Sequence, residues 1–528
     1  MLLGTERNGM AQRKKRYLLA LVLLLVAGLA LMIGYASRKQ GYHVDELYTY
    51  ELTNYPGGFY ALQEGYLDTW QPGSLFDSVL HPDHAFDYSV PWNNQKIDVH
   101  PPLYYCAVYT AECLFPWLDL PWSGLIPNFV CLLAGTFALY WAARRMTGRF
   151  WVSWVAAAVF LCNVGTQGMA VFTRMYALLM LETVLLVLAH LTLYRRLLAG
   201  ERPRWVFLGL AAATMAGALT QYFFLVFCFF FCGLFGLWLL CTRRWKTAAL
   251  YVVAEFGGLG AAYLTFPTMK QHIFSGSRGQ QALGSFFDLS ALSDWAASVG
   301  RVLSLLGAQF GGAVLWALLL LLAAALLWKA GCRPRGMGLF ACMLALAGFF
   351  YILVIDKAAP FEADRYYVLI YGPLILAATA VLAKLAALYP RWEPLMAIVV
   401  LLPVLSAHLT VGNGYLYTQY ADREPALEET ASLPAVVLNK AGYDVAPDLF
   451  LPEFARREAV YQAHCGDEAE SLADAVESKD LSGGFVLYGY IYEADELLDL
   501  AQSVLDIQSA ELLTDVARCP VYYITLKE

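Results

Sequence analysis

The chain of 528 residues is 59% hydrophobic and 15% charged, and its mean hydropathy is +0.51. This composition excludes an ordinary soluble globular protein, in which about 25% of the residues are charged. The formal net charge of −7 also argues against a nucleic-acid-binding protein, which needs a basic surface. We therefore expect most of the chain to lie in a bilayer, where helices satisfy their own backbone hydrogen bonds.

The first apolar run, residues 17–36, follows the basic cluster Arg13, Lys14, Lys15 and Arg16. A basic flank before an apolar core is shared by signal peptides and membrane anchors. We favour a retained anchor, because the run is long for a signal peptide and the cleavage site after it is poorly defined. Since Lys and Arg in short loops stay cytoplasmic, we expect the N-terminus in the cytoplasm.

Further apolar runs alternate with short basic loops, which the same charge rule assigns to the cytoplasm. Runs near the roughly 20 apolar residues that a spanning helix needs predict about eleven membrane spans. The predicted spans are residues 17–36, 124–143, 151–168, 174–194, 205–220, 221–241, 248–266, 311–328, 337–355, 367–387 and 394–411. An odd number of spans places the C-terminus outside the cytoplasm.

Residues 103–118 are apolar but do not fit as a span, because counting them would move Arg144 and Arg145 to the outer side. Their aromatic side chains suit a membrane surface. We therefore predict an interfacial helix for this segment.

The expected organisation is an α-helical polytopic membrane domain, residues 1–411, followed by a small external domain, residues 412–528. The membrane domain carries a long first external loop, residues 37–102. The tail alternates apolar stretches such as PAVVLNKAGYDV, GGFVLYGYIY and CPVYYITLKE with helix-like segments, a pattern that predicts an α/β domain. Cys465 and Cys519 lie in this domain and could pair in an oxidising compartment.

Two adjacent carboxylates, Asp45 and Glu46, follow the first span in the segment GYHVDELYTYELTNYP. If this segment folds back against the helices, desolvation and mutual repulsion raise the pKa of at least one carboxyl group, which suits a general base. The alternative is a solvated acidic start of a loop.

The first external loop ends with KIDVHPPLYY, in which paired prolines fix the backbone. We expect this rigid segment to hold Asp98 and His100 near the membrane surface. The alternative is a helix start in which Asp98 caps the helix and His100 is a surface residue.

Arginines open two predicted spans from the outer side, against the positive-inside pattern: Arg174 and Arg365. Such a cation usually faces an anion or a water-filled cavity, and the anion most available at this depth is a lipid phosphate. The alternative is that both side chains snorkel to the interface. Lys270, His272 and Arg278 add positive charge to the second external loop, although ordinary solvated charge is the simpler interpretation for each of them.

The sequence contains only a weak pattern of possible metal ligands. The stretch HPDHAFD holds His81, Asp83, His84 and Asp87, but no further ligand lies at a diagnostic distance. We predict no metal-binding residue and no certain cofactor, while a divalent metal ion remains compatible with the sequence. Three ionisable residues inside predicted spans, Glu182, His190 and Glu255, are expected to form interhelical hydrogen bonds, or in the case of His190 to lie at the cytoplasmic end.

Several segments, taken in order, resemble the GT-C glycosyltransferases. The likeness is strongest to bacterial family 39 enzymes, which are related to protein O-mannosyltransferases and to the aminoarabinose transferases of lipid A. The segments are VDELYTYEL, DVHPPLYY, RMYALLMLE, TQYFFLVF and DRYYVLIYGPLILA. The resemblance covers approximately residues 10–411 and does not extend to the tail.

The resemblance implies transfer of a sugar from a polyprenyl-phosphate donor to a glycan, lipid or protein acceptor at the outer membrane face, with inversion and without a nucleotide sugar. By position, Asp45 would be the general base and Glu46 would position the acceptor or the base. The resemblance and the loop charges together give the candidate donor- or substrate-binding residues Asp98, His100, Arg174, Tyr176, Tyr222, Lys270, His272, Arg278, Arg365 and Tyr366. The chain departs from the family at Asn128, where many relatives carry an arginine, so Arg174 or Arg365 would have to compensate.

Two other functions fit part of the pattern. A polytopic lipid or sugar transporter of the cell envelope would also place charged and aromatic residues in a helical bundle, but the sequence has neither the internal repeats nor the paired broken helices of many transporters. A non-catalytic scaffold for envelope assembly would leave Asp45 dispensable.

Overall fold

The computed structural model describes residues 2–83, 85–201, 204–276, 279–281, 295–333, 335–359 and 363–527, together with Gly284 and Phe361. The chain divides into two compact units. The helical unit comprises residues 1–36, 99–104 and 125–414, and the α/β unit comprises residues 37–98, 105–124 and 415–528.

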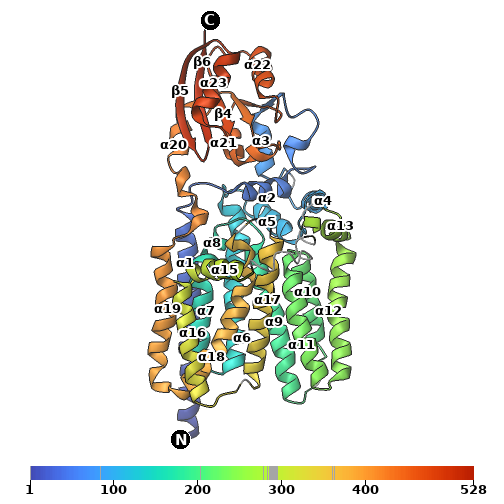
Figure 1. Cartoon of the computed structure of the whole chain (residues 1–528), viewed down its shortest axis with the longest axis vertical. Helices are drawn as coiled ribbons and strands as arrows, with labels where there is room; N and C mark the ends of the chain where they lie inside the picture. The colour runs from blue at the N-terminus through green and yellow to red at the C-terminus, as the bar shows by residue number, and fades with distance from the viewer. Residues whose placement is uncertain are drawn as a thin grey trace. The chain divides into compact units, whose positions relative to one another are not determined.

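The helical unit is a bundle whose long helices run alongside one another (Figure 1). These helices are α1 (Leu2–Ala36), α6 (Trp122–Thr147), α7 (Phe150–Cys162), α9 (Tyr176–Leu198), α10 (Val206–Ala218), α11 (Phe223–Cys241), α12 (Trp245–Thr265), α16 (Ala313–Lys329), α17 (Met337–Ala358), α18 (Tyr371–Leu388) and α19 (Glu393–Thr410). Shorter helices are α8 (Val164–Ala170), α13 (Met269–Phe274), α15 (Trp295–Gln309) and the 3-10 turns η3 (Asp364–Tyr366) and η4 (Val368–Ile370).

Among the described residues, eight helices are long and apolar enough to cross a membrane, or up to ten if each of two bent pairs is one span. The chain is therefore a multi-pass membrane protein, as its composition predicts. The remaining predicted span, residues 205–220, is the shorter apolar helix α10, whose 13 residues measure only about 20 Å along the axis.

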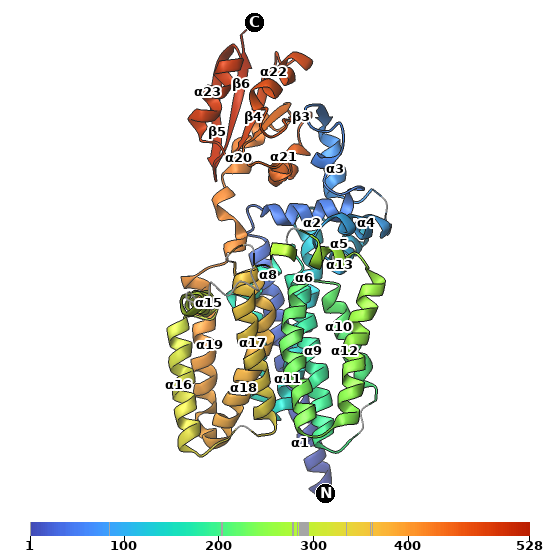
Figure 2. The same cartoon turned by 45° about the vertical axis from the view of Figure 1, so that its right-hand side comes forward.

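Two predicted spans are bent rather than continuous. Helices α7 and α8 meet at 55° where Asn163 ends α7 and caps α8 by accepting a hydrogen bond from the Thr166 backbone N–H. The last part of α15 meets α16 at 93° through two glycines with positive φ, Gly311 and Gly312 (Figure 2). A side chain at Gly311 would clash with the Pro403 carbonyl oxygen, 2.2 Å from where its Cβ would lie.

Carboxyl groups inside the bundle are held by neighbouring threonines. Glu182 accepts a hydrogen bond of 2.9 Å from Thr220, and Glu255 accepts one of 2.6 Å from Thr214. The Glu255 bond joins α12 to α10 and confirms the expected interhelical hydrogen bonding, whereas the Glu182 bond joins α9 to the turn that follows α10. They satisfy polar groups that would be costly to leave alone in a bilayer.

The predicted interfacial segment forms the helix α5 (Leu103–Leu114). Its 12 residues extend about 18 Å along the axis, too short for a hydrocarbon core of about 30 Å. The helix ends earlier than the predicted residue 118, and it is not one of the helices that are long and apolar enough to cross a membrane.

The α/β unit is built on a six-stranded sheet of order β1-β3-β2-β4-β6-β5. Strands β2, β3 and β4 are parallel, while β1, β6 and β5 each run antiparallel to their neighbour. The strands are β1 (Trp70–Pro72), β2 (Ala435–Asn439), β3 (Ala459–Gln462), β4 (Phe485–Tyr490), β5 (Ile507–Val516) and β6 (Cys519–Leu526). The three apolar stretches singled out in the tail are β2, β4 and β6, so the predicted α/β domain is confirmed.

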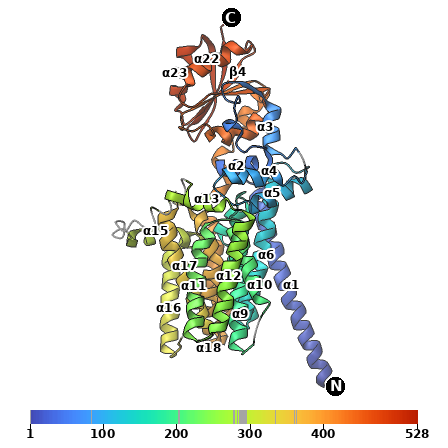
Figure 3. The ribbon, with the colours of Figure 1, turned by 90° about the vertical axis from the view of Figure 1, so that its right-hand side faces the viewer.

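Each face of this sheet is covered by helices (Figure 3). Alternation along β2 sends Val436 into one core, with helices α22 (Glu468–Ser478) and α23 (Ala494–Val504), and Val437 into the other. The second core is closed by α2 (Val44–Asn54), α3 (Gly73–Leu80) and α21 (Leu451–Phe454). Cys465 and Cys519 are free thiols.

The first external loop is a structural part of the α/β unit. Its strand β1 pairs with β3 through Trp70 opposite Tyr461, and its helices α2 and α3 complete one core. Helix α4 (Ser89–Ile97) packs on α2 through Asn94, which donates hydrogen bonds to the carbonyl groups of Leu52 and Tyr55. The sequence expectation assigns this loop to the membrane domain, whereas the structure groups it with the tail.

Candidate active site

The predicted acidic pair lies in the first turn of α2. His43 caps this helix by accepting a hydrogen bond of 3.0 Å from the Asp45 backbone N–H, and Glu46 returns to accept one of 3.0 Å from the His43 backbone N–H. This reciprocal arrangement is a capping box, which fixes where α2 begins and holds both carboxyl groups in a defined position.

Glu46 is also the partner of a buried cation. Lys39 Nζ lies 2.9 Å from Glu46 Oε2, with both side chains at most 1% exposed. The ammonium group also faces the rings of Tyr42 and Tyr417 at 5.4 and 5.0 Å. Burial lowers the pKa of Lys39, and the nearby Glu46 carboxylate opposes that shift.

Asp45 differs from Glu46 in its accessibility. The Asp45 side chain is 26% exposed, and its Oδ2 lies 3.5 Å from His43 Nδ1. Of the two neighbouring carboxyl groups, one is therefore buried in an ion pair and the other is partly exposed. This arrangement suits proton transfer by Asp45 and a positioning role for Glu46.

The DVHPP segment divides between the two units. Asp98 ends α4 as its C-cap residue, and its backbone N–H donates to the Asn94 carbonyl. His100 belongs to the helical unit, where its Nε2 lies 3.4 Å from Arg174 Nη2.

His100, Arg174 and Arg365, called here the cationic cluster, are connected through Phe172 and its neighbours in the helical unit. Arg174 follows Phe172 in a tight turn, and the Arg365 guanidinium lies 5.7 Å from the centre of the Phe172 ring. Both arginines are buried, at 5% and 8% exposure. Buried guanidinium groups of this kind are placed to recognise a phosphate or carboxylate.

Aromatic side chains build the walls of the cationic cluster. Tyr176 stacks on Phe172 with ring centres 6.0 Å apart, and it meets Tyr366 edge-on at 6.3 Å. Tyr366 also lies beside the Arg365 guanidinium at 5.3 Å. Four of the predicted donor residues thus gather in one place with His100.

Asn128, the position at which the chain departs from the family, is hydrogen bonded to residues next to the cationic cluster. Its Oδ1 accepts a hydrogen bond of 2.9 Å from Tyr104, and its Nδ2 donates one of 2.7 Å to the Phe172 carbonyl. The side chain is fully buried. Asn128 therefore holds the turn that carries Arg174.

Two of the remaining predicted residues, Tyr222 and His272, form a second pair. Tyr222 hydrogen bonds to His272 Nδ1 at 2.9 Å, and the adjacent Phe223 contacts Tyr366 edge-on at 5.6 Å. His272 is buried, whereas Lys270 is exposed. The predicted Arg278 lies outside the described residues, as does His84 of the weak HPDHAFD pattern.

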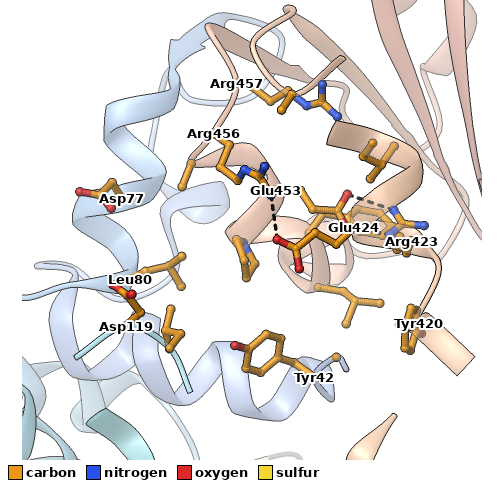
Figure 4. A pocket seen from close by; sticks show the side chains of 18 of the residues that line it. Tyr42, Asp77, Leu80, Asp119, Tyr420, Arg423, Glu424, Glu453, Arg456 and Arg457 are labelled. Carbon is orange, nitrogen blue, oxygen red and sulfur yellow. Dashed lines mark hydrogen bonds and ion pairs between the residues drawn. The ribbon is translucent and has the colours of Figure 1, made fainter. Parts of the chain in front are cut away.

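The α/β unit contains a cavity of about 570 Å³ with charged and aromatic walls (Figure 4). Arg423 pairs with Glu453 through two contacts of 2.6 and 3.2 Å, and Arg456 reaches Glu424 at 3.1 Å. The cavity is also lined by Tyr42, Asp77, Leu80, Asp119, Tyr420, Phe450 and Arg457. The lining therefore combines paired charges with aromatic rings.

The sequence matches no protein-family model and no curated protein. Among solved structures, it is similar to ArnT from Cupriavidus metallidurans, over 95% of this chain and 97% of that chain. The TM-score is 0.52 with 15% identity for ArnT bound to undecaprenyl phosphate, and 0.53 with 13% identity for the apo state. The apo oligosaccharyltransferase from Archaeoglobus fulgidus matches with a TM-score of 0.50 and 12% identity, over 92% of this chain and 68% of that chain.

The chain has the GT-C fold. This finding confirms the architecture that the sequence segments imply, and it extends the likeness to the tail, since the match to ArnT covers nearly the whole chain. Within this fold the residues of the cationic cluster come from three of the segments that carry the resemblance described above: DVHPPLYY, RMYALLMLE and DRYYVLIYGPLILA.

Sequence reasoning missed three features of the chain: Lys39, Phe172 and the cavity of the α/β unit. Lys39 is a signal that could have been used, because it is a cation close to the outer end of the first predicted span, where the positive-inside rule disfavours one. Phe172 and the cavity gave no signal, since their surroundings come from distant parts of the sequence.

Proposed function

We propose that the chain transfers a sugar from a polyprenyl-phosphate donor to an acceptor hydroxyl group at the outer face of a membrane. The observation that carries this proposal is the buried cationic cluster of His100, Arg174 and Arg365 inside a bundle with the GT-C fold. A buried pair of arginines lined by aromatic rings suits a phosphate attached to a long apolar chain.

The ArnT structure similar to this chain is bound to undecaprenyl phosphate. This likeness supports a polyprenyl phosphate as the lipid, because the same fold accommodates one in that protein. In this proposal the residues that contact the sugar select between a hexose and a pentose.

In the proposed step the acceptor oxygen attacks C1 of the sugar with inversion. The bond between C1 and the phosphate oxygen breaks, the hydroxyl proton passes to the Asp45 carboxylate, and polyprenyl phosphate leaves. Arg174 and Arg365 stabilise the negative charge that develops on the leaving phosphate. Glu46 and Lys39 keep Asp45 in place through the start of α2.

The cavity of the α/β unit supports a carbohydrate-like acceptor for this reaction. Its tyrosines could stack on sugar rings, and its Arg423–Glu453 and Arg456–Glu424 pairs offer both donors and acceptors to hydroxyl groups. In this proposal the N-terminus is cytoplasmic and the α/β unit is extracytoplasmic, following the charge of the loops.

Lipid analysis of the purified protein tests the donor. We expect a polyprenyl phosphate, free or carrying a sugar, in the organic extract of the wild-type protein by mass spectrometry. Arg174→Gln and Arg365→Gln should each lower its amount at least severalfold, because each removes a charge-assisted contact to phosphate.

Arg196→Gln is the matched control, since Arg196 is an arginine of α9 whose side chain is 51% exposed. It should retain the lipid at the wild-type amount. A wild-type protein without polyprenyl phosphate, or equal amounts in all four proteins, would overturn the assignment of the donor site.

A further inference from the structure

A compact group of ligand-type side chains lies inside the helical bundle, apart from the cationic cluster. It comprises His190 of α9, Cys232 of α11 and Glu255 of α12. Their ligand atoms all lie within 4.8 Å of one another, the one such group of His, Cys, Asp and Glu among the described residues. The proposed transfer reaction uses none of them.

The separations fit a tetrahedral metal ion. His190 Nε2 lies 3.4 Å from Glu255 Oε1 and 3.7 Å from Cys232 Sγ. Zinc bonds of about 2.0–2.1 Å to nitrogen or oxygen and about 2.3 Å to sulfur place tetrahedral ligands about 3.3 Å apart for N and O, and about 3.6 Å apart for N and S. Small adjustments would therefore bring the three atoms to bonding distance of one ion.

Each of two ligands is already oriented by a second contact. His190 Nδ1 lies 2.9 Å from the Leu186 carbonyl oxygen, which accepts a hydrogen bond from Nδ1–H, so that the lone pair is on Nε2. Glu255 Oε2 accepts a hydrogen bond of 2.6 Å from Thr214, while its Oε1 has no hydrogen-bond partner among the described residues and is buried. Outer contacts of this kind typically accompany metal ligands and fix their direction.

Charge balance favours a divalent ion at this depth. A thiolate from Cys232 and a carboxylate from Glu255 together neutralise one divalent cation, while His190 binds as the neutral imidazole. A neutral complex avoids the high cost of an isolated charge between membrane helices. Binding to the protonated thiol and carboxylic acid would release two protons, which are taken up by the solvent.

We propose that His190, Cys232 and Glu255 bind one zinc ion that ties α9, α11 and α12 together. Imidazole, thiolate and carboxylate are all zinc ligands, and their combination in a four-coordinate site is typical of this metal. Two groups are placed to provide a fourth ligand: Cys228, buried one helical turn before Cys232, and the Tyr251 hydroxyl, 2.9 Å from His190 Nε2.

The competing explanation is a hydrogen-bonded network without metal. Tyr251 lies within hydrogen-bond distance of His190 Nε2 and of the Cys232 carbonyl oxygen, at 2.9 and 3.1 Å. In that case a metal ion would have to displace existing bonds, and added zinc would neither be retained nor raise the melting temperature.

The test uses the full-length protein purified in detergent and treated with a chelator. After incubation with zinc chloride and removal of excess metal, elemental analysis should find about one zinc ion per chain. Cobalt(II) in place of zinc should give the thiolate-to-metal charge-transfer absorption of a Cys–Co bond. Neither readout depends on glycosyl transfer.

Cys232→Ser and Glu255→Gln should weaken zinc binding at least tenfold, since even outer-shell partners typically contribute about 10- to 100-fold. Cys241→Ser, an exposed cysteine of α11, and Glu182→Gln, a buried span carboxyl group held by Thr220, are matched controls that should bind zinc like the wild type. If either ligand variant fails to fold, the cobalt spectrum of the wild-type protein decides alone. A wild-type protein without stoichiometric zinc, or without the charge-transfer band, would overturn the proposal.

Discussion

The two acids at the start of α2 have different surroundings and therefore different expected roles. Glu46 is buried and holds Lys39, whereas Asp45 is partly exposed on the same turn. Removing one member of a buried ion pair leaves the other charge without compensation, which costs more than removing an exposed charge. Substitution of Glu46 should therefore mainly lower the stability of the protein, whereas substitution of Asp45 should mainly lower its activity.

Glu46→Gln should destabilise the protein by about 3 kcal/mol, a typical cost of breaking a buried pair. It also weakens the capping box at His43. Asp45→Asn should change the unfolding midpoint much less. Thermal unfolding of the two variants in the same detergent measures the difference, and equal midpoints would contradict the distinction drawn between the two carboxyl groups.

The sequence predicts the kinds of residue in the candidate site better than their partners. Arg174 and Arg365 are expected because a cation at the outer end of a span is unusual, and Tyr366 is expected from the resemblance to the GT-C enzymes. The sequence does not predict that the Arg365 guanidinium lies over the Phe172 ring, or that Asn128 holds the turn before Arg174, because these contacts join distant segments of the chain.

At the scale of elements, hydropathy predicts the spans well and the short strands poorly. Each predicted span corresponds to a helix, although two are bent at Asn163 and at Gly311 and Gly312. Strands β2, β4 and β6 follow from their apolar stretches. Strands β1, with three residues, and β3, with four, are not predicted, because so short a run shows no hydrophobic period.

The pairing of β1 with β3 depends on a close approach of backbones at Gly73. A Cβ at this position would lie 2.0 Å from the Arg457 carbonyl oxygen, a backbone atom that cannot rotate away. Gly73→Ala should therefore destabilise the α/β unit by about 1–3 kcal/mol, the usual cost of overpacking.

Gly483→Ala is the matched control, since no atom lies within 4 Å of its added Cβ. Its unfolding midpoint should remain close to that of the wild type. Limited proteolysis of the first external loop provides a second measurement, because loss of the β1 pairing should expose residues around Trp70 to cleavage. Equal stability of both variants would contradict the observed packing.

At the scale of the whole molecule, buried acids should make stability depend on pH. Burial raises the pKa of Glu112 to about 8 from 4.5, against the opposing hydrogen bonds of Asn54 and Ser123. Burial also raises the pKa of Glu51 and of Asp448, and repulsion by Glu51 adds to the effect on Asp448. The folded α/β unit therefore binds more protons than the unfolded chain between these pKa values.

Because the folded pKa is raised, the contribution of Glu112 to stability is complete below pH 4.5 and is lost as the pH rises towards 8. Glu112→Gln should flatten this decline in the melting temperature. Glu477→Gln, at an exposed position of α22, should leave it unchanged. A wild-type melting temperature that rises from pH 4.5 to pH 8 would contradict the conclusion that Glu112 is protonated in the folded protein over this range.

The most direct test of the account is turnover in proteoliposomes supplied with polyprenyl-phosphate sugars and a candidate acceptor glycan. We predict that the wild-type protein releases polyprenyl phosphate from one of these donors in step with glycosylation of the acceptor. Asp45→Asn should lower that rate by on the order of a hundredfold or more, since a general base typically contributes at least this much. Release at the wild-type rate by Asp45→Asn, or no donor consumption by a wild-type protein that retains the lipid, would contradict the proposed mechanism.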